Sequence, residues 1–242
     1  METRPMFPLG TVLLPGMSLA LRIFEPRYLQ MLEEVIAGEG LFGVVLIERG
    51  SEVGGGDVRS GVGTLARIVQ YESMGAGQYA ILAVGQSRIR VESWLDDAPY
   101  PRAEISEWPD IELLGRGVLG SAAFYSGDLD SGAVDGGDVG CGGDVGGGGD
   151  VGGGAELAEK YGSCVVELRH LLATAMEFGH QVAPATSEVP NDPIAGSHAL
   201  VALAPLGPFD RQRLLEAPGA LDRLALLSDL MAEQLSLIVD GG

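Results

Sequence analysis

Residues 21–28 read LRIFEPRY, and this stretch defines a corner between a strand and a helix. A proline is well tolerated in a first helical turn, where its missing N–H would have no partner. After it, apolar side chains recur along one helical face, at Tyr28, Leu29, Leu32, Val35 and Ile36. Gly38 is typical of a helix end. The stretch therefore predicts a strand that ends at Phe24 and an amphipathic helix that begins at Glu25-Pro26.

Four residues of this corner, Phe24, Glu25, Arg27 and Tyr28, are candidates for a functional site. We expect Glu25 to accept hydrogen bonds from amides of the first helical turn, and Arg27 to pair with Glu25 or with another acidic neighbour. In one interpretation the corner serves folding alone, because Tyr28 turns inward with the helix. In the other, the same residues form the wall of a peptide-binding groove. The sequence leaves both interpretations open.

The remainder of residues 1–110 predicts a β-rich subdomain. Apolar and β-branched runs predict four strands after the helix, at 42–48, 62–69, 79–84 and 87–92. Turns are predicted where glycine separates these runs, at 54–57, 75–77 and 85–86. The last run alternates polar with apolar residues, which predicts a strand with one side in water. Short strands at this spacing are typical of a small barrel or a curled sheet.

Residues 155–242 predict a helical subdomain. One long apolar face recurs at helical spacing from Leu157 to Met176, and another runs from Leu221 to Ile238. Shorter helices are predicted at 198–203 and at 211–216. These helices have to pack on each other or on the sheet to bury their apolar faces. The chain is thus predicted to be an α+β protein.

Residues 111–154 predict a linker that contains a flexible insertion. Residues 135–154 consist almost entirely of Gly, Asp and Val, and the unit Gly-Gly-Asp-Val recurs with a period of six. Such a segment buries too little apolar surface to offset its backbone entropy. Calcium-binding glycine-aspartate repeats use a longer unit. Weak cation binding by Asp138, Asp144 and Asp150 is the alternative interpretation.

The chain is strongly acidic, with 34 Asp and Glu against 15 Lys and Arg and a formal net charge of −19. Residues 1–110 hold 15 acidic and 9 basic residues (net −6), and residues 111–242 hold 19 and 6 (net −13). No basic cluster interrupts this charge, so we expect neither nucleic acid nor a membrane as a partner. Pro8, Pro15 and Gly16 interrupt the apolar run 7–24 and no convincing cleavage site follows it, so we expect no signal peptide. No run is long enough to cross a bilayer. We therefore expect a cytoplasmic protein.

The residue types that carry most enzyme chemistry are scarce or poorly spaced. The single lysine, Lys160, lacks the neighbours of a Walker A loop, and with Ser163 it forms one turn of helix surface rather than a peptidase dyad. Cys141 and Cys164 are too few for a disulfide framework or a four-ligand zinc site. The histidines lie apart, where we expect partial exposure, at His170, His180 and His198. We therefore expect no catalytic residue, no metal site and no cofactor.

Several segments resemble one known family. The opening segments 7–9 (FPL), 12–16 (VLLPG) and 21–28 closely resemble the start of the Lon N-terminal domain family. Residues 63–68 (GTLARI) and 79–90 look like its later strands. The resemblance implies a PUA-like β-rich barrel or sheet followed by a helical bundle, and a role in recognising proteins or peptides.

The same resemblance implies a set of peptide-binding residues. It adds Arg67, in the strand 62–69, to the four corner residues Phe24, Glu25, Arg27 and Tyr28. Proteases of the family carry an ATPase and a Ser-Lys peptidase after this domain, and this sequence shows the motif of neither. We therefore expect a non-catalytic module.

The leading hypothesis is a module that binds unfolded or extended polypeptide, with a protease or a chaperone as a further partner. The polypeptide would add to an exposed strand edge, and an apolar groove is expected where the sheet meets the helices. The alternative hypothesis is a scaffold protein that binds one specific partner, of basic charge, through its helical half. An ATP-dependent peptidase is the third hypothesis, and the scarcity of lysine argues against it.

Overall fold

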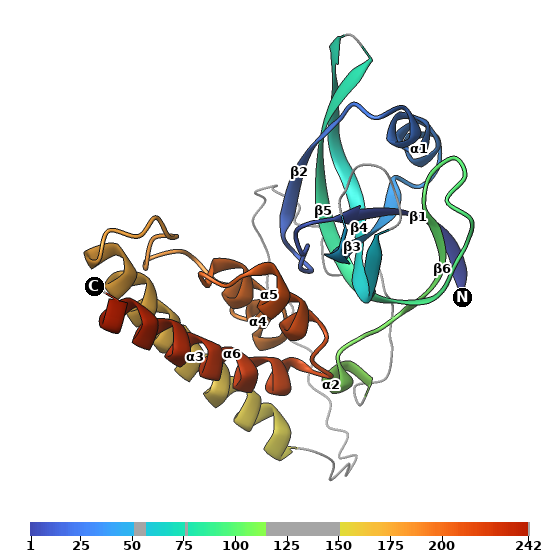
Figure 1. Cartoon of the computed structure of the whole chain (residues 1–242). Coiled ribbons are helices and arrows are strands. Elements are labelled where there is room, and N and C mark those ends of the chain that lie inside the picture. Colours follow the sequence, from blue (N-terminus) through green and yellow to red (C-terminus); the bar gives the residue numbers. More distant parts are fainter. Residues whose placement is uncertain (51–56, 76, 115–150, 242) are drawn as a thin grey trace, which may run out of the picture.

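The computed structural model describes residues 1–50, 57–75, 77–114 and 151–241, which form a β half and a helical half (Figure 1). The β half consists of β1 (Glu2–Leu9), β2 (Ser18–Ile23), α1 (Pro26–Ala37), β3 (Leu41–Arg49), β4 (Val58–Gly75), β5 (Gln78–Trp94) and β6 (Arg102–Glu107). The helical half consists of α2 (Ile111–Leu114), α3 (Val151–Glu177), α4 (Pro193–Leu203), α5 (Pro208–Leu215) and α6 (Ala220–Gly241). The prediction of an α+β protein is confirmed.

The strands form a small barrel organised around β5. The sheet has the order β2-β5-β4-β3-β1-β6, and an additional pairing of β5 with β6 closes it. The long β5 pairs with β2 from Tyr79 to Val84 and with β6 from Ile89 to Trp94. Strands β1 and β3 are parallel, and the other pairs are antiparallel.

Helix α1 begins and ends where the sequence predicts. Pro26 lies in its first turn, and Gly38 caps its C-terminal end. Its buried face packs on the barrel through Tyr28, Met31, Leu32 and Val35. The rings of Tyr28 and Phe7 stack with their centroids 4.1 Å apart. This tertiary packing, more than helix propensity, stabilises a helix of 12 residues.

The predicted turn at 85–86 is wrong, because one continuous strand, β5, runs through it. A Cβ atom at Gly85 would lie 2.5 Å from the carbonyl oxygen of Leu14, and the pairing with β4 shifts register beside it. Glycine is needed there for a close backbone approach rather than for a turn. The turn predicted at 75–77 is confirmed, since Gly75 and Gly77 have φ angles of 80° and 71°. Most of the turn predicted at 54–57 lies outside the described residues.

The helices α3 and α6 lie side by side and run in the same direction. Cys164 Sγ lies 3.4 Å from the carbonyl oxygen of Leu224, and Ser228 donates to Glu167 at 2.7 Å. Helix α4 begins earlier than predicted, because Asp192 caps it by accepting from the Ala195 amide at 2.9 Å. None of the described helices is both long and apolar enough to span a membrane.

The predicted linker 111–154 is helical at both of its ends. Its first four residues form α2, and its last four begin α3. The prediction of a flexible insertion there is therefore wrong for residues 151–154. Residues 115–150, which include Asp138, Asp144 and Asp150 of the repeat, lie outside the described part of the chain.

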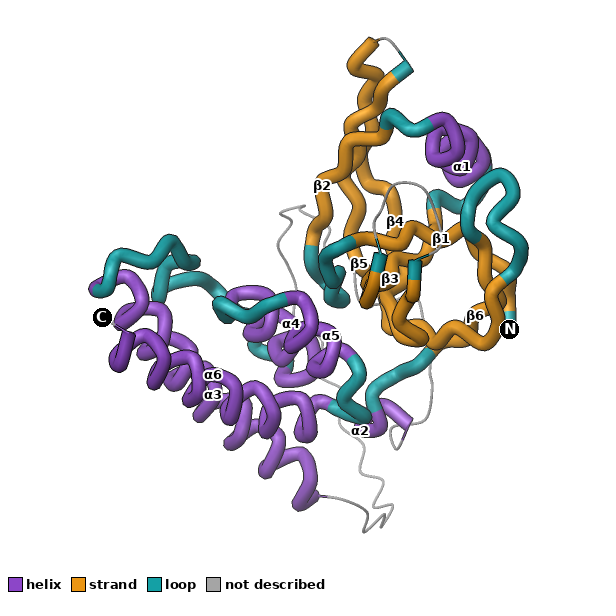
Figure 2. The backbone as a smooth tube through the Cα atoms, in the orientation of Figure 1, coloured by secondary structure: helices purple, strands orange, loops and turns teal. Residues whose placement is uncertain are grey.

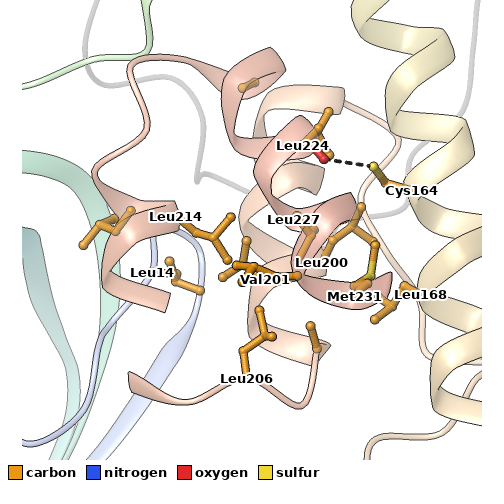
Figure 3. Close-up of a cluster of buried hydrophobic side chains, with 14 of the residues drawn as sticks. Leu14, Cys164, Leu168, Leu200, Val201, Leu206, Leu214, Leu224, Leu227 and Met231 are labelled. Atoms are coloured by element: carbon orange, nitrogen blue, oxygen red, sulfur yellow. Dashed lines mark hydrogen bonds between the residues drawn. The ribbon is translucent and has the colours of Figure 1, made fainter. Parts of the chain in front are cut away.

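The two halves share a hydrophobic core (Figure 3). Leu14 from the barrel lies close to Leu214, Val201 and Leu206 of the helical half in this view. The barrel residues Val12, Leu46 and Val62 belong to the same buried cluster. The described side chains therefore fill the place where we expected an apolar groove.

Candidate functional site

Tyr28 is a core residue. Its side chain is 4% exposed, between Phe7 on one side and the guanidinium of Arg27, whose carbon lies 4.5 Å from the ring centroid, on the other. Burial raises the pKa of Tyr28 to about 12. This placement agrees with the folding-corner interpretation for Tyr28.

The charged residues of the corner pair with each other. Arg27 Nε donates to Glu25 Oε2 at 3.0 Å. Glu25 makes no side-chain hydrogen bond to the first turn of α1, so the expectation that it accepts from these amides is wrong. Its carboxylate forms an ion pair with the Arg27 guanidinium instead. Phe24, directly before them, is 58% exposed.

Arg67 lies at the other end of α1. Its Nη1 donates to the carbonyl oxygen of Glu39 at 2.8 Å, two residues after the end of the helix. A helix of 12 residues is about 18 Å long. The five predicted site residues therefore do not form one cluster.

Arg67 also marks the point at which β4 leaves the barrel. The pairing of β4 with β3 ends at Arg67 and Leu41, and the Ile68 amide then bonds the carbonyl oxygen of Gly40 at 2.9 Å. Beyond this point β4 pairs with β5 alone, as far as Gly75 and Gln78. We call residues 69–75 of β4 with residues 78–82 of β5 the hairpin arm. Figure 2 shows the arm projecting beyond the rest of the barrel.

The hairpin arm combines an unpaired strand edge with exposed apolar side chains. Every residue from Val69 to Gly75 is exposed. Val69 is 54% exposed, and Tyr71 and Met74 are each 53% exposed. Strand β2 reaches the arm where Ile23 pairs with Tyr79, so the exposed Phe24 follows directly. Phe24 and Arg67, which lie at opposite ends of α1, thus both adjoin the arm.

A second group of polar residues lies buried where the halves meet. We call Arg88, Asp110, Ser197, His198 and Arg223 the junction cluster. Asp110 is 3% exposed, forms an ion pair with Arg88 at 2.6 Å and accepts a hydrogen bond from Arg223 at 2.5 Å. Arg223 also donates to Ser197 Oγ at 2.6 Å, and Arg88 donates to the carbonyl oxygen of Leu215 at 2.8 Å. These contacts join β5, the segment before α2, α4 and α6.

The sequence did not indicate this cluster. The expectation that His198 is partly exposed is wrong, since its side chain is 5% exposed and lies 3.8 Å from Asp110. Burial, reinforced by Arg223 and Arg88, holds the pKa of His198 well below its usual value. Burial also lowers the pKa of Arg88 to about 10, against the attraction of Asp110. We interpret the cluster as structural, because its charged groups bind each other and hold the barrel and the helices together.

Other surfaces offer less to a ligand. An open hollow of about 510 Å³ lies between α3 and α6, and its lining includes Glu156, Glu159, Asp222, Lys160 and Ser163. It is wide open to solvent, and acidic side chains lie on both of its helices. In the part of the chain that the structure describes, no three His, Cys, Asp or Glu side chains are placed to hold a metal ion.

Comparison with protein families gives one match that spans most of the chain. The model described as "ATP-dependent protease La (LON) substrate-binding domain" matches residues 3–233. Lon protease 2 of Myxococcus xanthus is 30% identical over 125 residues, which are 47% of this chain and 15% of that protein. The Lon protease of Desulfosudis oleivorans is 32% identical over 123 residues, which are 49% of this chain and 15% of that protein. The chain thus spans a small part of the length of these relatives.

Two solved structures share the fold. A Lon N-terminal domain protein from Xanthomonas campestris superimposes with a TM-score of 0.57 at 22% identity, over 96% of this chain and 98% of that chain. The N-terminal domain of the Mycobacterium avium complex Lon protease superimposes with a TM-score of 0.54 at 16% identity, over 96% and 99%. At such identities the likeness concerns the fold alone.

Proposed function

Because the chain belongs to the LON substrate-binding domain family, we propose that it is a non-catalytic module that binds unfolded or extended polypeptide. We propose further that the hairpin arm is its contact surface. The observation that carries this assignment is the exposure of Val69, Tyr71 and Met74 beside an unpaired strand edge.

The physical argument rests on what unfolded chains expose. An unfolded polypeptide presents apolar side chains and unpaired main-chain groups, which folded proteins hide. The arm offers exposed apolar side chains and an unpaired strand edge, which can contact these two kinds of group. Exposed apolar side chains that gather on one surface are typical of interaction sites, whereas isolated ones need no explanation.

The remaining proposals follow from this role. A module without turnover delivers what it holds, so we propose a protease or a chaperone as the further partner. We propose a cytoplasmic location, where such partners meet unfolded chains. Neither nucleic acid nor a membrane is proposed as a partner, because a net charge of −19 repels both phosphates and anionic lipids.

The test is a fluorescence-anisotropy titration against labelled, reduced and carboxamidomethylated ribonuclease A, a permanently unfolded polypeptide of basic net charge, with ATP and without. We expect saturable binding that ATP does not change. The double variant Tyr71→Ser/Met74→Ser should bind about 10-fold more weakly, because side chains at the centre of a contact carry most of its free energy. The matched control is Val166→Ser/Leu237→Ser, which removes two equally exposed apolar side chains from α3 and α6.

The same experiment tests the scaffold hypothesis, because Val166 and Leu237 are 67% and 65% exposed on the helical half. If the control variant of the helical half lost binding while the arm variant kept it, the contact surface would lie on the helices. If no unfolded polypeptide bound at any concentration, the module assignment itself would be wrong. A pull-down that returns one basic protein would then favour the scaffold hypothesis.

A further inference from the structure

We propose that polypeptide binds to the free edge of β4 as an added β-strand, held by main-chain hydrogen bonds along residues 69–75. This inference rests on the proposed function and states how the polypeptide is held. The bound segment is extended, and neutral or basic segments bind in preference to acidic ones.

The first argument is the state of the edge. On the side away from β5, the last main-chain bond of β4 joins the Ile68 amide to Gly40. From Val69 to Gly75, only β5 pairs with β4 among the described strands, and all of these residues are exposed. The main-chain groups on the outer side therefore face water, and they are ready to pair with another extended chain.

The second argument is that the edge lacks most of the usual protection. Natural edge strands are protected by proline, by lysine, by a covering segment or by bulges, and of these the described residues show only bulges here. Residues 69–75 read VQYESMG and contain neither proline nor lysine. Their one charged residue is Glu72. Two bulges lie within the edge where β4 pairs with β5, between Ile68 and Gln70 and between Ser73 and Gly75, and neither ends the strand.

The third argument is a comparison with β2, whose outer edge is also unpaired in the sheet order. The exposed residues of β2 are Ser18, Ala20 and Arg22, and its larger apolar residues pack toward the core. The β4 edge exposes Val69, Tyr71 and Met74 instead. An added strand there gains side-chain contacts as well as main-chain bonds, so we place the polypeptide on β4.

The charge of the protein favours one kind of polypeptide segment at the edge of β4. The net charge is −19, and Glu72 lies exposed within the edge itself. A basic segment is therefore attracted and an acidic one repelled. A second copy of this chain carries the same large negative charge, which disfavours pairing of two such edges. A neutral or basic extended segment fits best.

The proposed mode also fits a broad choice of partners. Main-chain bonds are the same for every sequence except at proline, so they supply affinity without reading side chains. Seven residues of strand span about 23 Å, which is long enough for several such bonds.

The experiment uses three labelled peptides of about seven residues. One alternates valine with arginine, the second has glutamate in place of arginine, and the third is the arginine peptide with alternate backbone amides N-methylated. N-methylation removes main-chain donors and keeps every side chain. We expect the arginine peptide to bind, the glutamate peptide to bind about 10-fold more weakly at low salt, and the methylated peptide to lose at least about 10-fold in affinity.

Hydrogen exchange of the full chain locates the contact. The arginine peptide should slow exchange of amides within residues 69–75 that face away from β5, and leave those of β2 unchanged. Glu72→Lys should reduce the preference for arginine over glutamate, because it reverses the charge within the edge itself. The matched control Glu233→Lys makes the same charge change on an exposed position of α6 and should keep the preference.

Each contrary result has a distinct meaning. If unfolded ribonuclease A and the peptides bind but N-methylation has no effect and residues 69–75 stay unprotected, the added strand is wrong while the proposed function stands. If neither the polypeptide nor any peptide binds, both are wrong. If residues 69–75 become protected without peptide as protein concentration rises, the occupant is a second copy, and the proposal is again overturned.

Discussion

The two ends of one strand pair, β4 and β5, have opposite surroundings. At one end Ser60 and Arg88 are completely or almost completely buried, and both contact the helical half. At the other end the same two strands form the hairpin arm, where every residue from Val69 to Gly75 is exposed. The first end is fixed by polar bonds and apolar packing, and the second is left without a partner on one edge.

This difference separates stability from binding within one element. The junction cluster and the shared apolar core hold the barrel and the helices in one arrangement. The arm takes little part in this core, so its side chains are free to serve a ligand. Substitutions at the junction should therefore change the free energy of unfolding, and substitutions on the arm should change affinity.

The largest expected effect is at the junction. Asp110→Ala leaves Arg88 and Arg223 buried without their shared carboxylate, and we expect a loss of about 3–5 kcal/mol in the free energy of unfolding. Urea unfolding followed by circular dichroism measures it. Asp229→Ala, at an exposed position of α6, is the control and should change little. A loss below about 1 kcal/mol for Asp110→Ala would show that the junction is not the anchored end.

Tyr28→Ala should lower the free energy of unfolding nearly as much as Asp110→Ala does. It removes a buried ring that stacks on Phe7, and we expect a loss of about 3–4 kcal/mol in the free energy of unfolding. Thermal and urea unfolding measure the loss, and Tyr28→Phe is the control because it keeps the stacked ring. If Tyr28→Ala left stability unchanged and abolished peptide binding, the folding-corner interpretation would be wrong and the groove interpretation right.

Gly85→Ala tests the middle of β5, between the two ends. The new Cβ would meet the carbonyl oxygen of Leu14 at 2.5 Å, and backbone has to shift to relieve the contact. We expect a loss of about 1–3 kcal/mol. Gly61→Ala is the matched control, because nothing lies within 4 Å of its added Cβ. Equal effects of the two substitutions would contradict the close approach at Gly85.

Gly85 also shows how far the sequence predicts this fold. Periodicity and turn residues predicted α1, the strands β2 to β5 and the long helices, because each depends on neighbours in the chain, and they did not predict β1 or β6. The turn predicted at Gly85 was wrong. Glycine is needed there because the main chain of Leu14, far away in sequence, approaches closely, and such a glycine looks the same in sequence as a glycine in a turn. Local patterns cannot distinguish these two reasons for glycine.

The junction cluster was missed for a similar reason. Residues 87–92 alternate polar with apolar residues, which predicted a side in water; Arg90 and Glu92 are exposed there, but Arg88 contacts the helical half and is 3% exposed. His198 lies in an apolar segment, and this was the one available signal of its burial. The arm was predicted only in general terms, as an exposed strand edge, because sequence does not show where β3 stops pairing with β4.

The junction should also make stability depend on pH. The pKa of His198 is held well below its usual value in the folded protein, so the unfolded chain binds a proton at a higher pH than the folded one. Stability should therefore fall as pH decreases from about 6.5 toward the folded pKa. Unfolding free energies between pH 7 and 5 should fall less steeply for His198→Gln than for the wild type. An equal slope for His198→Gln and the wild type would contradict this role of His198.

The smallest expected effect on stability is on the arm. Tyr71 is 53% exposed on a strand whose outer edge is unpaired, so Tyr71→Ser removes few contacts and should change the free energy of unfolding by less than about 0.5 kcal/mol. Val166→Ser on α3 should change it by a similar amount, yet only the arm variant should weaken binding of the unfolded polypeptide. A destabilisation of about 2 kcal/mol by Tyr71→Ser would place the arm within the core. The buried and the exposed end of β4 and β5 would then no longer differ in role, because both ends would contribute to stability.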